Sequence, residues 1–535
     1  MAESEHGMIA WMARNFVRLS VAVMIALIAG GAYFAWRLSI DEAETFADPV
    51  AQFKYGSTGG DRNFGLPYVM WEAMPRLFAD LMPEGREGEG WAAFGFIYEP
   101  EEDLPAEFGE VRPVGTSLRD HMGIERIFLN CAGCHAGRVR VSEDGAPIIV
   151  AGMPSNTVDL SAFQTFMARA VVDERFTAAR FLAEIDAMGL EIDLVNRAAL
   201  KLVGVGMVRE RLLSIVDRFD DFVGHEPAFG PGRFDTFNPA KALMNWDFDA
   251  IPEAEMIGVV DFPSIFLQGP KEGMQLHWDG NNTKVSERNR SAAFGTGAFP
   301  PILDRDSLAR VEDWLVSAEP PSFIEIFPDH FDPVLAADGA GIYAAACAEC
   351  HGADGRDFTG EHVGQVTHID RIRTDRGRLD NYTRDLAVNQ NMLYGGFGDE
   401  RFQSFGKTDG YANAPLDGLW LRAPYLHNGS VPTIAALLEH PTLRPRAFLR
   451  GYDVYDPEAL GFVSDPADIP SDRHDRLFCY ATEAAGLSDC PAGAPAMNGA
   501  CDDGPCRGNG NGGHLYGIYL AEADKRALTE FLKTF

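Results

Sequence analysis

The sequence predicts a mainly α-helical protein in which two large domains with long irregular loops follow a short apolar helix at the N-terminus. Its 535 residues exceed the roughly 100 to 200 residues of an ordinary single domain. An apolar fraction of 46% and a charged fraction of 23% are typical of globular proteins. The 55 Gly and 32 Pro indicate many turns and long loops.

Residues 1–40 predict a membrane anchor or signal helix. The run 19–36 contains no charged side chain, Arg14 and Arg18 precede it, and Arg37 follows it. This length is close to the roughly 20 apolar residues that span a bilayer, and the preceding basic residues favour an N-terminus that stays inside. We expect a periplasmic protein tethered to the inner membrane by residues 19–36. The alternative is secretion after cleavage of a signal near Ala29.

Residues 41–325 form the first predicted domain. Gly, Pro and aromatic residues predict irregular structure up to about residue 110. Periodic apolar residues predict a helix from Ser117 to Asn130, and a Pro-free stretch from Leu160 to Phe222 predicts two or three amphipathic helices. From Pro227 to Pro300, Gly, Pro and Asn predict long loops, which are commonly functional.

Residues 326–535 form the second predicted domain. A helix predicted from Leu303 to Ser317 precedes the Pro-rich segment "AEPPSFIEIFPDHFDP", and we place the domain boundary there, near residue 325. The last helix is predicted from Ala521 to Phe535, where Ala527 is small enough for close contact with another helix.

The chain is strongly acidic, with a formal net charge of -33. Such a surface repels nucleic acid and anionic lipid heads, so we expect no nucleic-acid partner. It suits a cationic redox partner protein, for example a basic cytochrome. A solvated acidic surface without a partner is the alternative.

Two Cys-x-x-Cys-His motifs carry the clearest chemistry. They lie at Cys131, Cys134 and His135, and again at Cys347, Cys350 and His351. Cysteines three residues apart lie on one side of a helical turn, where both can bond the vinyl groups of a haem, and the next residue then offers an imidazole to the iron. The sequence therefore predicts two covalently bound haem c groups, with His135 and His351 as proximal iron ligands.

Two other uses of such cysteines are less consistent with the sequence. A zinc site requires both pairs to converge, and they lie more than two hundred residues apart. A thioredoxin-like redox site requires a strand followed by a helix, whereas we expect each motif to follow a helix. Export agrees with the haem assignment, because persistent disulfides belong to the same oxidising compartments.

The other four cysteines predict two disulfides near the C-terminus. Cys479, Cys490, Cys501 and Cys506 allow three pairings. We expect the adjacent pairing, Cys479 with Cys490 and Cys501 with Cys506. These bonds would hold the loop that presents His514.

Several runs resemble known di-haem proteins. The stretches "AADGAGIYAAACAECHGADG" and "LAEADKRALTEFLKTF" resemble the first and last helices of a cytochrome c domain, which cross over the haem edge. "GLWLRAPYLHNGSVPTIAALL" and "HWDGNN" are similar to segments of bacterial di-haem cytochrome c peroxidases. "FKYGSTGG", "LHWDGNNTKVSERNRSAAFG" and "RGYDVYDP" resemble most closely the rubber oxygenase-like group of that superfamily. The resemblance implies two cytochrome c-like haem domains.

The resemblance also suggests roles for particular residues. His514 follows a Gly/Asn stretch, precedes the last helix and resembles the distal ligand of the C-terminal haem, with Met392 and His427 as competitors. Trp278 resembles the tryptophan that shortens the electron path between the haems, with Trp246 as second choice. We expect His427 to line a haem pocket, or else to be a hydrogen-bonded structural histidine.

The N-terminal haem has no evident distal ligand in the sequence. Similar peroxidases place a glutamate shortly after the tryptophan, whereas "RNRSAAFGTGAFP" offers Phe294 and no acid. An apolar distal side suits dioxygen better than peroxide, because cleaving the O–O bond of peroxide needs a proton donor. Phe294 is therefore a candidate pocket residue, and an ordinary core residue is its alternative.

Three functions follow from these expectations. The chain is an oxidoreductase whose N-terminal haem reacts with O2, a peroxidase that reduces H2O2 there, or a membrane-tethered electron carrier without a substrate of its own. In each, the C-terminal haem transfers electrons. We favour an enzyme, because the chain is long for electron transfer alone.

Overall fold

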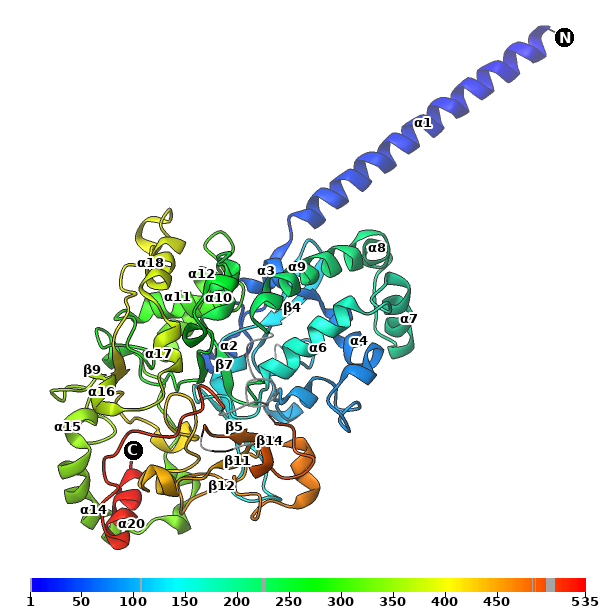
Figure 1. The fold of residues 1–535 in the computed structure, drawn as a ribbon. Coiled ribbons are helices and arrows are strands. Elements are labelled where there is room, and N and C mark those ends of the chain that lie inside the picture. Colours follow the sequence, from blue (N-terminus) through cyan, green and yellow to red (C-terminus); the bar gives the residue numbers. More distant parts are fainter. Residues whose placement is uncertain (1, 106–107, 224–227, 484, 486, 497–505) are drawn as a thin grey trace.

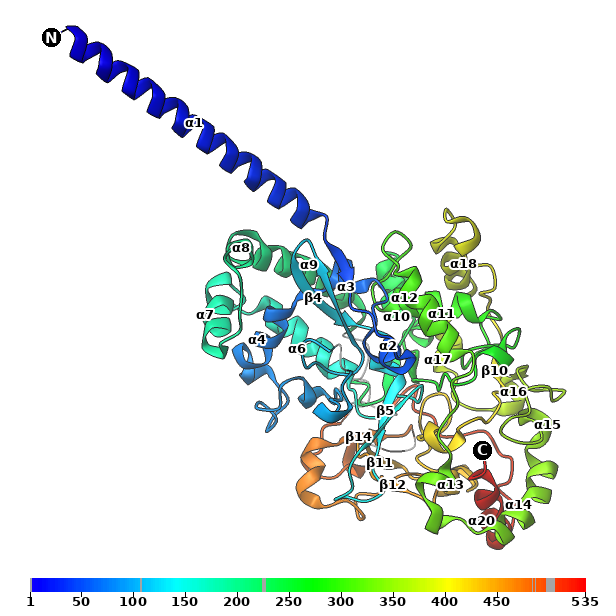
Figure 2. The ribbon, with the colours of Figure 1, turned by 180° about the vertical axis from the view of Figure 1, so that it is seen from behind.

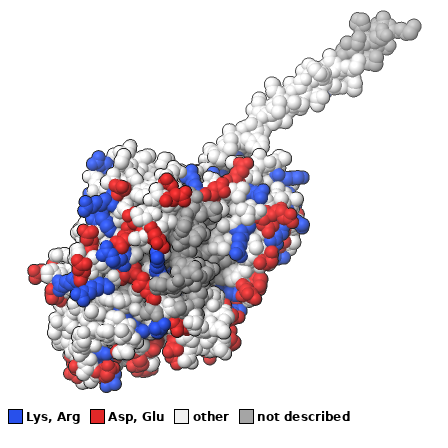
Figure 3. All heavy atoms as spheres, viewed as in Figure 1, with Lys and Arg blue, Asp and Glu red and all other residues white. Residues whose placement is uncertain are grey.

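The computed structural model describes residues 2–105, 108–223, 228–483, 485, 487–496 and 506–535. About 45% of the chain is helical. Helix α1 (Ala2–Leu38) projects from a body of many helices, one four-stranded sheet and several antiparallel strand pairs (Figures 1 and 2). Within α1, Trp11–Leu38 is long and apolar enough to cross a membrane, with a mean hydropathy of 1.9. Figure 3 shows α1 as a largely white rod beside a body covered with charge of both signs.

The first half of the body combines a sheet with a group of helices. The sheet has the strand order β1-β3-β4-β2. Its strands are β1 (Asp41–Ala43), β2 (Leu66–Pro67), β3 (Thr116–His121) and β4 (Ile124–Leu129). The helices beside it are α4 (Tyr68–Leu77), α6 (Leu160–Val172), α7 (Ala178–Met188), α8 (Leu194–Ala199), the π-helical turn η4 (Leu200–Gly204) and α9 (Val205–Val223). The amphipathic helices expected between residues 160 and 222 are therefore confirmed.

The prediction of a helix from Ser117 to Asn130 is wrong. These residues form the β3–β4 hairpin, in which His121 pairs with Ile124 and Thr116 with Leu129. Its two-residue turn, Met122 and Gly123, has φ angles of 59° and 73°. Positive φ at both central residues is what a type I′ hairpin turn requires. The Met-Gly turn and cross-strand pairing thus override the apparent helical period.

The first Cys-x-x-Cys-His motif follows this hairpin directly. Cys131 comes two residues after the end of β4, and the short helix α5 (Ala132–His135) carries the rest of the motif. The prediction that this motif follows a helix is therefore also wrong. The next strands, β5 (Ala136–Val139) and β6 (Ile148–Ala151), pair with each other.

The middle of the chain holds more regular structure than expected. Strands β7 (Arg233–Asp235) and β8 (Val259–Asp261) form an antiparallel pair. Helix α11 (Val285–Gly295) lies within the segment predicted as loops, and α12 (Arg305–Leu315) confirms the helix predicted from Leu303 to Ser317.

The C-terminal part contains the crossing expected of its first and last helices. Helix α14 (Pro333–Ala346) leads to α15 (Ala348–His351) with the second motif, and α20 (Glu522–Leu532) packs against α14 (Figure 1). The contact is so close that a Cβ on Gly339 would lie 2.0 Å from the carbonyl oxygen of Ala527. The close helix contact expected from the small Ala527 therefore also depends on Gly339.

One hydrophobic core joins residues from both sides of the predicted boundary. Val139, Val150 and Phe266 pack in the same cluster as Tyr343 and Trp420. The hairpin β11 (Ala447–Arg450) and β14 (Phe478–Ala481) also reaches the first half, since Phe478 covers Gly230. The boundary near residue 325 and the division into two haem domains stay predictions.

The α14–α20 crossing gives a first test. We expect Gly339→Ala to lower the free energy of unfolding by about 1–3 kcal/mol, because the added methyl overpacks the contact with Ala527. Gly341→Ala is the matched control, since nothing lies within 4 Å of its Cβ position and Ala is favoured over Gly in a helix by about 0.5–1 kcal/mol. Urea unfolding measures both. Equal effects of the two substitutions would contradict the close contact.

Candidate haem sites

The histidines of both motifs are held in a tautomer that can bind a metal. His135 Nδ1 lies 2.9 Å from the carbonyl oxygen of Pro263, and His351 Nδ1 lies 2.8 Å from that of Ala414. A carbonyl oxygen only accepts, so Nδ1 carries the hydrogen and Nε2 keeps a free electron pair. Burial, together with Arg288, lowers the pKa of His135 to about 3. Backbone carbonyls behind the ring are the usual support of metal-binding histidines.

The cysteines of the two motifs are unbonded and their thiols are neutral. Cys131, Cys134, Cys347 and Cys350 form no disulfide. Burial raises the pKa of Cys131 to about 11 and that of Cys134 to about 12. Reactive redox cysteines instead have depressed pKa values. The first motif follows β4 and leads into α5, so the expected absence of a strand before it is wrong; the burial of its thiols is the remaining argument against a thioredoxin-like site.

The zinc alternative is not supported by the arrangement of the side chains. Within the part of the chain that the structure describes, no group of three or more His, Cys, Asp or Glu residues is placed to hold a metal ion. The two Cys pairs therefore do not converge, and each motif stands as a separate site.

A second imidazole faces His351. The ring centroids of His351 and His514 are 6.3 Å apart. A metal bound by two opposite imidazole nitrogens at about 2.0–2.1 Å places the two rings roughly 6 Å apart. Burial, with smaller contributions from His351 and Arg444, lowers the pKa of His514 to about 3, so its ring is neutral. These residues fit a haem iron held between two histidines.

The neighbours of His514 explain its position. It has a φ of 46°, its backbone N–H donates to Ile372, and its carbonyl accepts from the Arg444 guanidinium. Arg444 also donates to the carbonyl of Gly513. The competing ligand Met392 is 70% exposed on α18 (Arg384–Leu393) and is turned to solvent.

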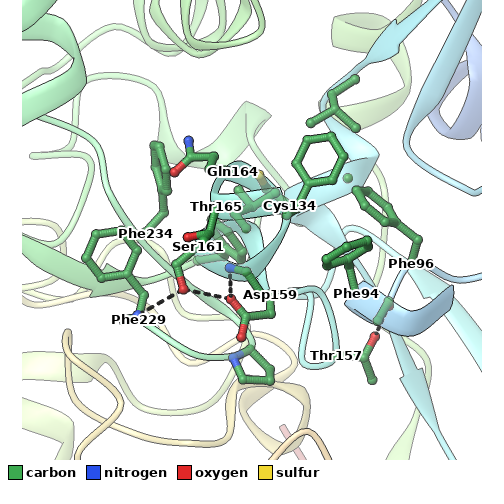
Figure 4. Close-up of a pocket in the computed structure, with 18 of the residues that line it drawn as sticks. Phe94, Phe96, Cys134, Thr157, Asp159, Ser161, Gln164, Thr165, Phe229 and Phe234 are labelled. Atoms are coloured by element: carbon green, nitrogen blue, oxygen red, sulfur yellow. Dashed lines mark hydrogen bonds between the residues drawn. The ribbon is translucent and has the colours of Figure 1, made fainter. Parts of the chain in front are cut away.

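A cavity of about 1800 Å³ opens on the first motif. Cys131, Cys134 and His135 line it, together with Trp278 and Phe294. The volume exceeds the roughly 300–1,000 Å³ of ordinary ligand pockets, so it can hold a haem and a further molecule. Figure 4 shows Cys134 among the rings of Phe94, Phe96, Phe229 and Phe234.

Two polar residues of this wall, Asp159 and Ser161, bond to neighbours within the wall. Asp159 caps α6 by accepting from the Ala162 N–H at 2.9 Å and from the Ser161 hydroxyl at 2.8 Å. Ser161 in turn accepts from the Phe229 N–H at 3.1 Å (Figure 4). The surface facing the cavity is therefore mainly aromatic and aliphatic here.

Helix α11 brings Phe294 and a cation to the cavity but no carboxylate. Arg288, Ser291, Ala292, Phe294 and Gly295 line it. The acid of this helix, Glu287, is buried elsewhere and accepts from the backbone N–H groups of Gln403 and Ser404 at 3.1 and 2.9 Å.

Trp278 is linked to both motifs, to the first by lining the same cavity and to the second by a backbone hydrogen bond. It lines the cavity, and its Nε1–H donates to the carbonyl of Asp261 at 2.8 Å. Its own carbonyl accepts from the Ala412 N–H at 2.8 Å, two residues before the Ala414 carbonyl that holds His351. The second choice, Trp246, packs instead against the Phe237 cluster.

His427, unlike Trp278, does not line the cavity. It is buried, its ring stacks on Tyr411 with centroids 4.1 Å apart, and its Nε2 lies 3.0 Å from the Tyr411 hydroxyl. Its carbonyl accepts from the Asp261 N–H at 2.9 Å. This environment is that of a hydrogen-bonded structural histidine, and its pocket role stays a prediction.

Sequence reasoning missed His277 and the residues around Asp261. His277 lines the cavity with a strained φ of 63°, and Arg288 Nη1 lies 3.4 Å from its ring nitrogens. Its position beside Trp278 in "HWDG" was the available signal. The buried carboxylate of Asp261 is paired with Arg450 at 3.0 Å and lies 3.7 Å from Arg233. No local pattern marks that pairing.

One of the two expected disulfides is confirmed. Cys479 and Cys490 are bonded, with an S–S distance of 2.01 Å. Cys506 is disulfide-bonded as well. Its predicted partner, Cys501, lies outside the described residues.

Comparison with known proteins supports the haem assignment at a coarse level. A family model described as RoxA-like, cytochrome c-like matches residues 410–449, which include Ala414 and His427 but neither Cys-x-x-Cys-His motif. Two Sinorhizobium fredii proteins are also similar. Uncharacterized protein y4iJ is 25% identical over 544 residues, 82% of this chain and 89% of that protein. Uncharacterized protein y4iM is 29% identical over 253 residues, 43% of this chain and 54% of that protein.

These findings support a cytochrome c of the rubber oxygenase-like group. A cytochrome c-like domain implies covalently bound haem c and a haem-dependent oxidoreductase. The apolar α1 is consistent with an exported cytochrome that has a signal or an anchor.

The ion pair between Asp261 and Arg450 gives a second test. We expect Arg450→Met to cost about 3–5 kcal/mol of unfolding free energy, because it leaves a buried carboxylate without its closest cation. Arg446→Met is the control, since the Arg446 side chain is 60% exposed beside Asp489 and such changes stay within about 0.5 kcal/mol. Urea midpoints of both variants measure the effect. A loss for Arg450→Met no larger than for Arg446→Met would contradict the role of this pair.

Proposed function

We propose that this chain is an exported di-haem c-type cytochrome oxidoreductase with one reactive and one electron-transfer haem. Cys131, Cys134 and His135 would hold the reactive haem. The electron-transfer haem would be bound by Cys347 and Cys350 and ligated by His351 and His514. The haems, when bound, supply iron centres that exchange electrons and, where a coordination position is free, bind O2.

The observation that carries this proposal is the difference between the two proximal histidines. His351 faces His514 across 6.3 Å, and two imidazoles leave no coordination position for a substrate. His135 instead faces a cavity of about 1800 Å³. The first site therefore suits chemistry and the second suits electron transfer.

Dioxygen is a better co-substrate for this site than peroxide. Peroxide cleavage needs an acid positioned at the reacting oxygen. On the α11 side the cavity is lined by Phe294, while Glu287 binds backbone groups elsewhere. The lining carboxylates Asp159 and Asp261 are held by the α6 cap and by Arg450. The aromatic walls around Cys134 favour an apolar organic substrate.

Trp278 supports an electron route between the sites. Its ring lies at the cavity wall and its carbonyl is bonded to the segment that supports His351. Its Nε1–H is fixed on a backbone carbonyl, which holds the ring in one orientation. The proposal includes tethering to the inner membrane through residues 19–36 and periplasmic exposure of the body. A cationic redox protein is the proposed electron partner.

Ligand binding tests the proposed asymmetry. We expect imidazole to shift the absorption and electron paramagnetic resonance spectra of about one haem of two, because only the His135 side is open. The other haem should stay low-spin throughout the titration. Two low-spin haems that bind neither imidazole nor peroxide would contradict both enzyme functions and indicate an electron carrier.

Removal of His514 tests the second site separately. We expect His514→Ala to convert the C-terminal haem to a form that also binds imidazole, which doubles the number of responding haems. His440→Ala is the control, because the His440 side chain is exposed and bonds to the neighbouring Thr442. An unchanged count of responding haems in His514→Ala would exclude His514 as the ligand.

A further inference from the structure

An exposed apolar surface lies on the helix formed by α8, η4 and α9. Leu194, Leu202, Val203 and Met207 are 85%, 78%, 57% and 61% exposed. Monomeric soluble proteins rarely expose clustered side chains of this size, and such clusters mark contacts with proteins or membranes. We call these four residues the α8–α9 surface.

The opposite side of the same helix packs against the interior of the protein. Leu200 and Val205 are buried in the large N-terminal core. Further along, Leu212, Ile215 and Val216 line the cavity at the first motif. The α8–α9 surface is therefore a second apolar stripe on a helix whose core-facing stripe is already packed. Val203 and Met207, four residues apart, lie on one face.

This surface lies where α1 leaves the body. Both ribbon views show α8 along the edge from which α1 projects (Figures 1 and 2). Arg37, in the last turn of α1, donates to the Gly123 carbonyl at 2.6 Å and to the Asn196 side-chain oxygen on α8. Asn196 also donates to Gly123 at 3.0 Å. The end of α1 is thus bonded to α8.

The charge around the surface differs from that of the whole chain. Residues 191–212 hold four basic and three acidic side chains, so this segment is close to neutral in a chain of charge -33. Lys201 is exposed beside Leu202, whereas Arg209 donates to the Val171 carbonyl at 3.0 Å and is bound to the body. A surface of apolar side chains with little net charge avoids the repulsion from anionic lipid heads that the rest of the chain would meet.

We infer that the α8–α9 surface rests on the phospholipid bilayer that α1 spans. The inference rests on the membrane tethering included in the proposed function. A spanning α1 brings the attached α8 to the bilayer surface, where Leu194, Leu202, Val203 and Met207 enter the headgroup region. The same continuous helix then carries the lipid contact on its N-terminal turns and lines the cavity further along, at Leu212, Ile215 and Val216.

Spin labelling of the full-length, haem-loaded chain tests this contact. Val203→Cys and Met207→Cys each receive a nitroxide label, and the protein is reconstituted in vesicles of phosphatidylglycerol and phosphatidylethanolamine. The control is Val334→Cys, which is 72% exposed on α14 at the far end of the body from α1. The measured quantity is the ratio of collision rates with O2 and with a water-soluble nickel complex.

We expect a severalfold higher ratio at positions 203 and 207 than at 334, because O2 concentrates in lipid and the nickel complex does not. Equal ratios at all three positions in vesicle-bound protein would overturn the lipid contact and leave the tether intact. Protein that does not sediment with the vesicles would overturn the tether and the contact together. Labels that are shielded from both reagents would show a second protein copy on the surface and would also overturn the inference. Unchanged haem absorption verifies folding of each variant.

Discussion

The arrangement around the first motif depends on Asp261, the last residue of β8, and on Pro263, which follows two positions later. The Pro263 carbonyl fixes the His135 ring, and the Asp261 carbonyl fixes the Trp278 ring. The Asp261 N–H bonds to the His427 carbonyl, and its carboxylate is held by Arg450. One short backbone segment therefore positions the His135 ring, the Trp278 ring and the backbone of His427. The ion pair between Asp261 and Arg450 keeps that segment in place.

The two motifs share a sequence pattern but have different surroundings. Each proximal histidine donates from Nδ1 to a carbonyl, so the support behind the two rings is the same in kind. The difference is on the opposite side, where His351 meets His514 and His135 meets a large cavity. This difference separates electron transfer from substrate chemistry in the proposed function.

Helix α9 connects the proposed reaction with the proposed membrane contact. One side of it closes the apolar cavity, and its N-terminal turns continue the exposed apolar surface beside α1. One helix would thus contact the membrane on its first turns and the cavity on its later turns. The acidic remainder of the body, with its net charge of -33, would stay in the aqueous phase.

The sequence by itself determined the features that depend on local chemistry and short spacing. These are the apolar helix with its preceding arginines, the helices between 160 and 222 and the two motifs, each of which follows from neighbouring residues or from a helical period. The crossing of α14 and α20 was expected from the resemblance to a cytochrome c domain, and the structure selected the Cys479–Cys490 disulfide among three possible pairings. The hairpin at Ser117–Leu129 was misread, because the Met122-Gly123 turn changes a period that otherwise fits a helix.

Only the tertiary structure decided what faces each motif. His514 approaches His351 from a distant loop, and its position depends on bonds to Ile372 and Arg444. The cavity beside His135 is formed by segments between Phe64 and Ala496. Likewise, Arg450 reaches Asp261 across 189 positions. Such contacts follow from packing between remote segments, and no local pattern records them.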